Sequence, residues 1–371
     1  MNYNEIRRKT AAIRVGSLTV GGWAPIAVQS MTNTDPHDFA GTLAQMHALK
    51  KAGCDIVRMT VPDAAAAETL FSLKEADPGM PLVADIHFDY RLAVLCAERG
   101  ADKIRINPGN IGSRENVRAV CRACRERKIP IRIGVNGGSL EKEILAKYGA
   151  PTPEALLESA LYHIRLLTDF DFTDIIVSIK ASEVATMIAA NRMLAERCPF
   201  PLHLGVTEAG GRERGRIKSA IGIGALLAQG IGDTVRVSLT EDPVAEIAAA
   251  KEILNALSIQ GQRGMDIVSC PTCGRTKIDL IELSARFEEA AKAENLLDFP
   301  IRVALMGCPV NGPGEAGNAD IGICGGNGEA LMISHGKILS KIPEDEIIPR
   351  LIAAVKEMKA KEEKNGGQNA D

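Results

Sequence analysis

Two cysteine motifs lie in the last third of this 371-residue chain. The first is a C-x-x-C motif, Cys270-Pro271-Thr272-Cys273, in which proline and a following glycine favour a loop between a strand and a helix. The second places Cys308 directly before Pro309. Two loops of this kind are more typical of iron–sulfur ligation than of a zinc ribbon, which would offer a second C-x-x-C motif. We therefore predict an iron–sulfur site, with a structural zinc site as the alternative.

The three motif cysteines leave a fourth ligand to be found. Glu315 follows Cys308 through a glycine-rich turn and is one candidate, and Cys324 within Gly322–Gly326 is the other. An oxygen ligand would be exchangeable and would leave an iron where a substrate could bind, whereas a set of four cysteines would suit electron transfer alone. Both candidates stay open at this point.

The other cysteines predict no second site. An odd total of nine, unevenly spaced, argues against a disulfide framework. Cys54, Cys96 and Cys198 are isolated in apolar or helical segments, where a small buried side chain is expected. Cys121 and Cys124 also form a C-x-x-C, but no glycine or proline opens a ligand loop there.

A second group of candidate residues is spread along the first 240 residues, at or near the ends of short β-branched runs. Strands that are buried on both faces should be continuously apolar, so a charge inside one costs free energy unless it is paired or faces a ligand. Alternating residues of a strand share a face, as Lys103, Arg105 and Asn107 do. The group comprises Arg58, Asp85, His87, Lys103, Arg105, Asn107, Arg132, Asn136, Lys180, Glu208 and Arg236.

The residue types in this group suit the binding of a small polyanion. Five or six converging cations match a phosphate or diphosphate, because arginine meets phosphate oxygens with two donors. Two carboxylates and a histidine could supply acid and base groups. Backbone amides of the run Gly134–Ser139 could add to the anion site. Structural ion pairs are the alternative for any single residue.

The elements that position these residues alternate between strand and helix. Eight strands with intervening helices match a (β/α)8 barrel, whose strand ends meet at one rim. An open doubly wound sheet is the alternative, but it usually has fewer strands and a glycine-rich first turn. The predicted strands are residues 26–30, 55–61, 82–87, 103–107, 131–136, 174–180, 202–208 and 234–239.

The pattern changes after the barrel. We expect a barrel over residues 1–257 with a hairpin at 11–22, a linker at 258–265, a smaller α/β cluster domain at 266–361 and a disordered tail at 362–371. In that second domain we predict strands at 267–269, 301–305 and 331–333 and helices at 280–294 and 344–361.

Composition limits the partners. The net charge of −3 provides no global field for nucleic acid or an anionic membrane. No apolar window approaches the length of a membrane span, and residues 1–8 lack the apolar stretch of a signal peptide, so we expect a cytoplasmic protein.

Five ordered motifs make residues 5–360 resemble a known family, the bacterial-type 4-hydroxy-3-methylbut-2-enyl diphosphate synthases of the non-mevalonate isoprenoid pathway. No departure from the family pattern is seen in them. The motifs are Val28–Thr34, Arg105–Asn110, Gly134–Leu140, Ser269–Arg275 and Met306–Glu315.

The resemblance implies a [4Fe-4S] cluster on Cys270, Cys273, Cys308 and Glu315, which returns Cys324 to a structural role. It also implies that the second domain is similar to the cluster domain of sulfite and nitrite reductases. The implied reaction is a two-electron reductive dehydroxylation that opens the ring of 2-C-methyl-D-erythritol 2,4-cyclodiphosphate, with flavodoxin or ferredoxin as the reductant.

The candidate residues fit that reaction in three roles. Asn107 and Asn136 would orient the substrate, and Glu208, or else Asp85 or His87, would donate the proton that turns the leaving hydroxyl into water. The residues that would neutralise the diphosphate are Arg58, Arg105, Arg132, Lys180 and Arg236.

The order of the two domains along the chain predicts how the cluster reaches the barrel. The last barrel helix runs away from the mouth, the rim at which the strand ends meet, and the linker from Ser258 to Gly264 spans at most about 25 Å. A cluster domain that serves the mouth must then come from another chain. We expect a head-to-tail homodimer with shared active sites, which the family also implies.

Two other functions are consistent with parts of the sequence. Lys180 on the sixth strand could be the Schiff-base lysine of an aldolase acting on a phosphosugar, which would leave the cluster without a purpose. A non-enzymatic iron–sulfur sensor would explain the cysteines but not the cations of the barrel.

Overall fold

The computed structural model describes residues 3–259, 264–310 and 312–367. The chain divides into two compact units, Met1–Gln260 and Gly261–Asp371, and each has its own core. Within the described residues, no helix combines the length and the apolar character needed to cross a bilayer.

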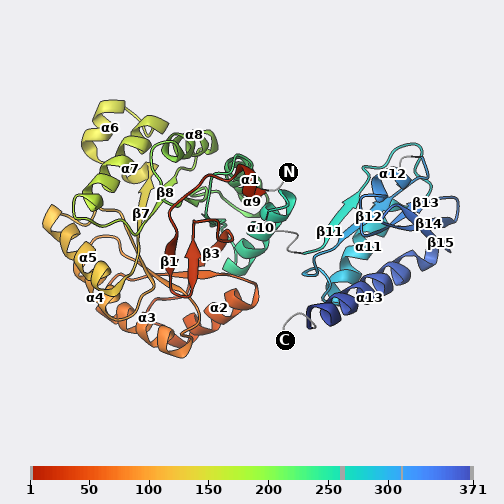
Figure 1. The fold of residues 1–371 in the computed structure, drawn as a ribbon, viewed down its shortest axis with the longest axis horizontal. Coiled ribbons are helices and arrows are strands. Elements are labelled where there is room, and N and C mark those ends of the chain that lie inside the picture. Colours follow the sequence, from red (N-terminus) through yellow and green to blue (C-terminus); the bar gives the residue numbers. More distant parts are fainter. Residues whose placement is uncertain (1–2, 260–263, 311, 368–371) are drawn as a thin grey trace. The chain divides into compact units, whose positions relative to one another are not determined.

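Eight parallel strands form the barrel of the first unit (Figure 1). Their order is β8-β7-β6-β5-β4-β3-β10-β9, and a parallel bridge between Val177 and Leu202 connects the two ends of the sheet. The barrel prediction is confirmed, although the last two strands are only two residues long. The strands are Ala27–Met31 (β3), Ile56–Thr60 (β4), Leu82–Asp85 (β5), Lys103–Ile106 (β6), Ile131–Asn136 (β7), Ile175–Lys180 (β8), His203–Leu204 (β9) and Thr234–Val235 (β10).

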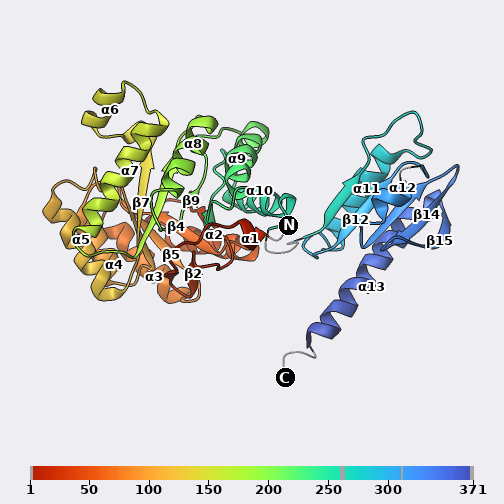
Figure 2. The same ribbon diagram turned by 45° about the horizontal axis from the view of Figure 1, so that its top comes forward.

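Helices surround the barrel strands (Figures 1 and 2). Side-chain caps such as Asp38, Asp63 and Ser113 accept backbone N–H groups at their first turns, which satisfies donors that a helix leaves free. The helices are Phe39–Lys51 (α2), Ala64–Ala76 (α3), Tyr90–Glu98 (α4), Arg114–Arg127 (α5), Lys142–Tyr148 (α6), Pro153–Thr168 (α7), Val184–Ala195 (α8), Arg212–Leu227 (α9) and Pro243–Ala256 (α10).

Helix α6 is an addition to a simple (β/α)8 barrel, and helix α9 starts in a segment without an apolar pattern. A short 3-10 turn, Gly137–Ser139, and α6 are inserted between β7 and α7. Helix α9 begins at Arg212, before any apolar pattern is seen in the sequence. Its first turn is highly charged and lies after two glycines, so it carries no apolar period, yet its residues are good helix formers.

A hairpin packs against the end of the barrel at which the strands begin. After the short helix Tyr3–Ile6 (α1), strands Ile13–Val15 (β1) and Leu18–Val20 (β2) pair antiparallel. Val15 and Val20 pack in one cluster with Ile56, Val83 and other residues at the starts of barrel strands. This apolar contact covers the end of the barrel opposite the polar residues.

The second unit is a five-stranded sheet in the order β11-β12-β13-β14-β15, with the first three strands parallel and the others antiparallel. Its main core packs α11 and α13 against the sheet. The elements are Asp266–Ser269 (β11), Leu280–Ala293 (α11), Arg302–Met306 (β12), Gly312–Ala316 (α12), Ile321–Gly325 (β13), Glu329–Ser334 (β14), Lys337–Pro343 (β15) and Ile347–Gly367 (α13).

Two strands of this unit, β13 and β15, were not predicted from the sequence. Strand β13 is rich in glycine and β15 is mostly exposed, so neither has a clear apolar pattern. The predicted disorder from Glu362 is wrong as far as Gly367, because α13 continues to that residue (Figure 2). Lysine and glutamate are good helix formers, and the i,i+4 pair between Glu357 and Lys361 supports the exposed helix. Residues 368–371 lie outside the described residues.

Candidate functional site

Most of the predicted polar group lies buried within the barrel. Strand register places Asp85 beside Arg105, and Arg105 beside Arg132, so these three side chains start from one level of neighbouring strands. Asn136 and Lys180 form a second aligned pair. The buried members are Asp85, Lys103, Arg105, Asn107, Arg132 and Lys180.

Asp85 is the counter-ion at the centre of this group. Its Oδ2 lies 3.1 Å from Nη2 of Arg58, and its Oδ1 lies 3.0 Å from Nη1 of Arg105. Burial alone would raise the pKa of this carboxyl, but the charges of Arg58 and Arg105 lower it below its usual value. Asp85 therefore stays ionised at neutral pH.

Arg236 has its own carboxylate, which sequence analysis did not predict. Glu246 on α10 accepts from Nε and Nη2 of Arg236 at 3.2 and 3.1 Å, and from Oγ of Ser30 at 2.8 Å. Glu246 is buried although it belongs to an outer helix. An isolated glutamate on an amphipathic helix gives no signal of such a role in one sequence.

Among the described residues, Arg132 has no carboxylate partner of its own. It is almost fully buried, and its Nε and Nη2 atoms have no hydrogen-bond partner in that part of the chain. Burial, together with the charges of Arg58 and Arg105, lowers its pKa well below the usual value. Because a buried cation without a partner is costly, this side chain is poised to accept an anion.

The two lysines of the barrel share this electrostatic environment. Burial lowers the pKa of Lys180, and the charges of Arg236 and Arg132 lower it further. Burial and the charge of Arg132 do the same for Lys103, whose Nζ lies 3.4 Å from Oε1 of Gln29. The barrel thus holds more cationic side chains than carboxylates.

Two glycines make room for the cations. A methyl group added at Gly134 on β7 would lie 2.5 Å from Nε of Arg105, and one added at Gly205 would lie 2.9 Å from Nζ of Lys180. Real carbon atoms do not approach so closely, so any other residue would displace the cation. The Gly134 motif therefore contributes space for the Arg105 side chain.

The side-chain amides of Asn107 and Asn136, which the sequence predicted as site residues, lie beside the same rim. Nδ2 of Asn107 lies 3.4 Å from Oγ of Ser139, and its Oδ1 accepts the Gly109 N–H at 3.1 Å. Asn136, the last residue of β7, is half-buried. The loops after β6 and β7 are thereby joined next to the cations.

His87 and Glu208 lie at the exposed margin of the rim. The side chain of His87 is 46% exposed, and its Nε2 lies 3.9 Å from Oδ2 of Asp85. Glu208 lies in a loop after β9, is exposed and has a left-handed φ of 52°. Neither side chain is buried as part of the cation group, so both are accessible to a ligand entering the barrel.

The three motif cysteines line one pocket of about 400 Å³ in the second unit. Cys270 follows β11, and Cys308 follows β12, the parallel strand beside it. The N–H of Gly307 points to Sγ of Cys270 at 3.4 Å. Hydrogen bonds from the Arg275 backbone and side chain lower the pKa of Cys273. Donors aimed at sulfur and a stabilised thiolate fit the cysteine ligation of an iron–sulfur cluster.

The described side chains do not complete a ligand set. No three His, Cys, Asp or Glu side chains within residues 3–259, 264–310 and 312–367 lie close enough together to hold one metal ion. Glu315 belongs to α12, but its side chain lies outside the described part of the structure.

Cys324 lies on β13 in a small apolar cluster with Ala304, Met306 and Ala316. Burial raises the pKa of its thiol to about 11, with added contributions from Cys308 and Cys270. A protonated, buried thiol is a poor metal ligand. The remaining cysteines of the barrel unit are buried as well.

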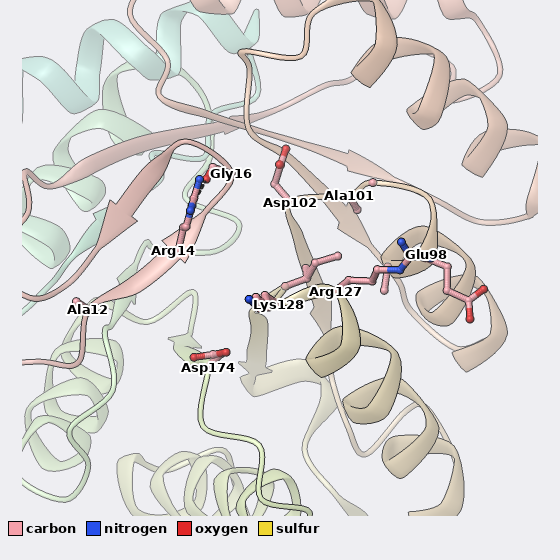
Figure 3. Close-up of a pocket in the computed structure, with 12 residues that line it drawn as sticks. Ala12, Arg14, Gly16, Glu98, Ala101, Asp102, Arg127, Lys128 and Asp174 are labelled. Carbon is pink, nitrogen blue, oxygen red and sulfur yellow. Dashed lines mark hydrogen bonds between the residues drawn. The ribbon is translucent and has the colours of Figure 1, made fainter.

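A larger pocket, of about 640 Å³, opens at the other end of the barrel (Figure 3). It lies between the hairpin and the starts of β6, β7 and β8. Arg14, Lys128 and Asp174 reach into it, and Lys74 already neutralises Asp102 on its wall. Its cations and carboxylates are balanced, so it lacks the excess positive charge of the opposite rim.

Comparison with known proteins agrees with this division of the chain. The family model described as the GcpE TIM-barrel domain matches residues 10–251, and the model described as the GcpE protein C-terminal domain matches residues 266–357.

Three curated relatives are similar over nearly their whole length, and each is named 4-hydroxy-3-methylbut-2-en-1-yl diphosphate synthase (flavodoxin). The protein from Geobacter sulfurreducens is 54% identical over 96% of this chain and 99% of its own. The relative from Clostridium perfringens is 54% identical over 94% and 99%, and that from Ruminiclostridium cellulolyticum is 53% identical over 95% and 98%. The chain therefore belongs to the GcpE family.

Proposed function

We propose that this chain is an oxidoreductase that converts 2-C-methyl-D-erythritol 2,4-cyclodiphosphate into (E)-4-hydroxy-3-methylbut-2-enyl diphosphate, in isoprenoid biosynthesis. The reaction opens the cyclic diphosphate and removes a hydroxyl as water, with two electrons supplied from outside. The observation that carries the proposal is the buried excess of cations at the barrel rim, in a chain so similar to enzymes named for this product.

The barrel unit would bind the substrate. Arg58, Lys103, Arg105, Arg132, Lys180 and Arg236 contribute six cationic side chains, against the carboxylates of Asp85 and Glu246. A diphosphate would supply the missing negative charge. It would also accept hydrogen bonds from Nε and Nη2 of Arg132, which have no partner within the part of the chain that the structure describes.

Neighbouring side chains would orient the substrate and move the proton. The amide groups of Asn107 and Asn136 would fix the carbon skeleton relative to the diphosphate. Glu208 is our proposed proton donor, because it is accessible at the rim. Asp85 is better suited as a counter-ion, because a carboxyl with a lowered pKa holds no proton at neutral pH.

The second unit would hold a [4Fe-4S] cluster on Cys270, Cys273, Cys308 and Glu315. When bound, the cluster would supply the two electrons one at a time. The Gly307 N–H and Arg275 would stabilise the sulfur charge through their hydrogen bonds to Cys270 and Cys273.

We further propose a head-to-tail homodimer in which the cluster unit of one chain serves the barrel of another. Helix α10 ends at Ala256 on the side of the barrel away from the rim, and β11 begins at Asp266. The segment between them can span at most about 36 Å, which is short for a return to the chain's own rim. The electron donor would be flavodoxin, as the names of the relatives indicate, or a ferredoxin.

The proposal is tested by anaerobic purification followed by iron and sulfide analysis, with spectra recorded before and after adding the cyclic diphosphate to reduced protein. We expect about four irons per chain, a spectrum that changes on substrate addition and formation of the linear diphosphate. A colourless zinc protein from a strictly anaerobic preparation would contradict the proposal.

A buried lysine with a lowered pKa is also what a Schiff-base enzyme would use, so Lys180 keeps an aldolase as the second candidate. Borohydride treatment in the presence of a phosphosugar separates the two functions. Covalent trapping on Lys180 would favour the aldolase, and we expect none.

A further inference from the structure

A buried histidine and a glutamate lie in close contact behind the loops that carry the proposed substrate amides. Nε2 of His163 on α7 lies 2.6 Å from Oε1 of Glu141, the residue just before α6. The His163 side chain is fully buried, and that of Glu141 is 16% exposed. This contact holds the start of the inserted helix against α7.

The pair also contacts the neighbouring loop. A methyl group added at Gly109 would lie 2.9 Å from Oε1 of Glu141, 3.3 Å from Nε2 of His163 and 3.4 Å from Oδ1 of Asn107. Gly109 donates its N–H to Asn107, whose Nδ2 reaches Ser139 in the loop that also holds Glu141. One compact set of contacts therefore fixes the loops after β6 and β7 to each other and to α7.

Stability alone gives little reason for this arrangement. Burying a carboxylate and an imidazole side by side recovers little free energy compared with apolar packing. The same two helices are already joined at the surface, where Glu158 of α7 accepts from Nζ of Lys147 at 2.6 Å and from the hydroxyl of Tyr148 at 2.7 Å. The two carboxylates differ in what lies next to them, because only Glu141 contacts the loops at the rim.

We propose that Glu141 and His163 are positioning residues for the substrate, holding Asn107, Asn136 and the amides of the glycine loop at the distance that the diphosphate requires. The inference rests on the proposed placement of the substrate at the barrel rim. Neither residue would touch the substrate itself. Their contribution is to keep the two loops fixed before binding, so that binding does not have to order them.

The test compares Glu141→Gln with the matched control Glu158→Gln in the anaerobic holoenzyme. Each substitution removes one carboxylate charge between α6 and α7 without changing side-chain size. We measure the Kd of the cyclic diphosphate by calorimetry, KM and kcat in turnover, and the midpoint of thermal unfolding. Glu141→Gln should weaken binding and raise KM by about tenfold to a hundredfold, since small misplacements of binding groups have effects of that size. Glu158→Gln should leave both unchanged.

A second variant keeps the inference testable if Glu141→Gln does not fold. Gly109→Ala keeps the Glu141–His163 pair but forces a methyl group against it, and it should also raise Kd and KM. Wild-type affinity in Glu141→Gln would overturn the inference, whatever happens to the unfolding midpoint. If Glu141→Gln does not fold, wild-type affinity in Gly109→Ala overturns it instead. If Arg132→Met binds the substrate as the wild type does, the placement of the substrate has failed, and the inference falls with it.

Discussion

The barrel rim and the cysteine pocket differ in how much of their chemistry the fold itself fixes. At the rim, strand register aligns Asp85, Arg105 and Arg132, and ion pairs hold their side chains in a buried setting. In the pocket, the sulfurs project from loops, Cys273 is exposed and Thr272 has a left-handed φ of 57°. Under the proposed function, anion binding would be a property of the barrel, whereas the cysteine site would be completed by what it binds.

The largest effect should come from removing a cluster ligand. Cys270→Ser should lose iron and all measurable turnover, because in our proposal electrons would reach the substrate only through the cluster. The barrel does not depend on that ligand, so its cations should remain in place. Iron and sulfide analysis and a product assay check the expectation, with Cys198→Ser in the barrel unit as a control. Turnover in an iron-free Cys270→Ser preparation would contradict the proposal that the barrel binds the substrate while the second unit supplies the electrons.

The next effect should be on the folding of the barrel. Asp85→Asn leaves Arg58 and Arg105 buried without their shared counter-ion, and this should cost about 3–5 kcal/mol of unfolding free energy at pH 6. Chemical unfolding of the variant and the wild type measures the difference. A loss below about 1 kcal/mol would mean that solvent, not Asp85, compensates these cations.

The same pair of proteins has a predicted pH dependence. The pKa of Asp85 is lower in the folded state than its ordinary value of 3.8. Its stabilising contribution is therefore present above about pH 4 and is lost as the pH falls towards the folded-state pKa. Between pH 6 and pH 3, the wild type should lose more stability than Asp85→Asn does.

A smaller effect separates binding from folding at the rim. Arg132→Met should weaken the affinity for the cyclic diphosphate by about 2–4 kcal/mol, because two charge-assisted hydrogen bonds are lost. It should not destabilise the fold, since the arginine has no carboxylate partner there. Calorimetry and thermal unfolding measure the two quantities. A large loss of stability with unchanged affinity would make Arg132 a structural residue.

The smallest effect should sharpen the description of the cysteine pocket. Cys324→Ala removes a buried sulfur next to the ligand loops and should cost about 1–2 kcal/mol of stability. Iron content per chain should stay at the wild-type value. If iron falls to the level of Cys270→Ser, then Cys324 is a ligand and the assignment of Glu315 has to be replaced.

The two regions also differ in how far the sequence predicts them. Barrel strands have apolar runs interrupted by charge at a fixed parity, so Arg105 and Asn107 could be placed on one face from residue spacing alone. Strand β13 could not be found, because its two apolar residues alternate with glycine and cysteine. Glu246 was missed for a different reason. It meets Ser30, which lies 216 residues away in the chain, only because β3 pairs with β10 where the barrel closes, and it meets Arg236 across the loop between β10 and α10.

Loop geometry was the other limit. The motif Gly134–Leu140 predicted an anion site from its amides. The space that Gly134 leaves for Arg105, and the contact of Glu141 with His163, depend on neighbouring elements. Such contacts are set by packing between segments, and no local pattern in a single sequence records them.

The most direct test of the central claim is calorimetric titration of the cyclic diphosphate into wild-type protein and into Cys270→Ser, both prepared without oxygen. If the barrel carries the anion site, both proteins should bind the substrate with dissociation constants within about tenfold of each other, a difference of about 1.4 kcal/mol, while only the wild type turns it over. If Cys270→Ser folds but does not bind the substrate, the barrel alone does not form the anion site, and the division of chemistry between the two units is wrong.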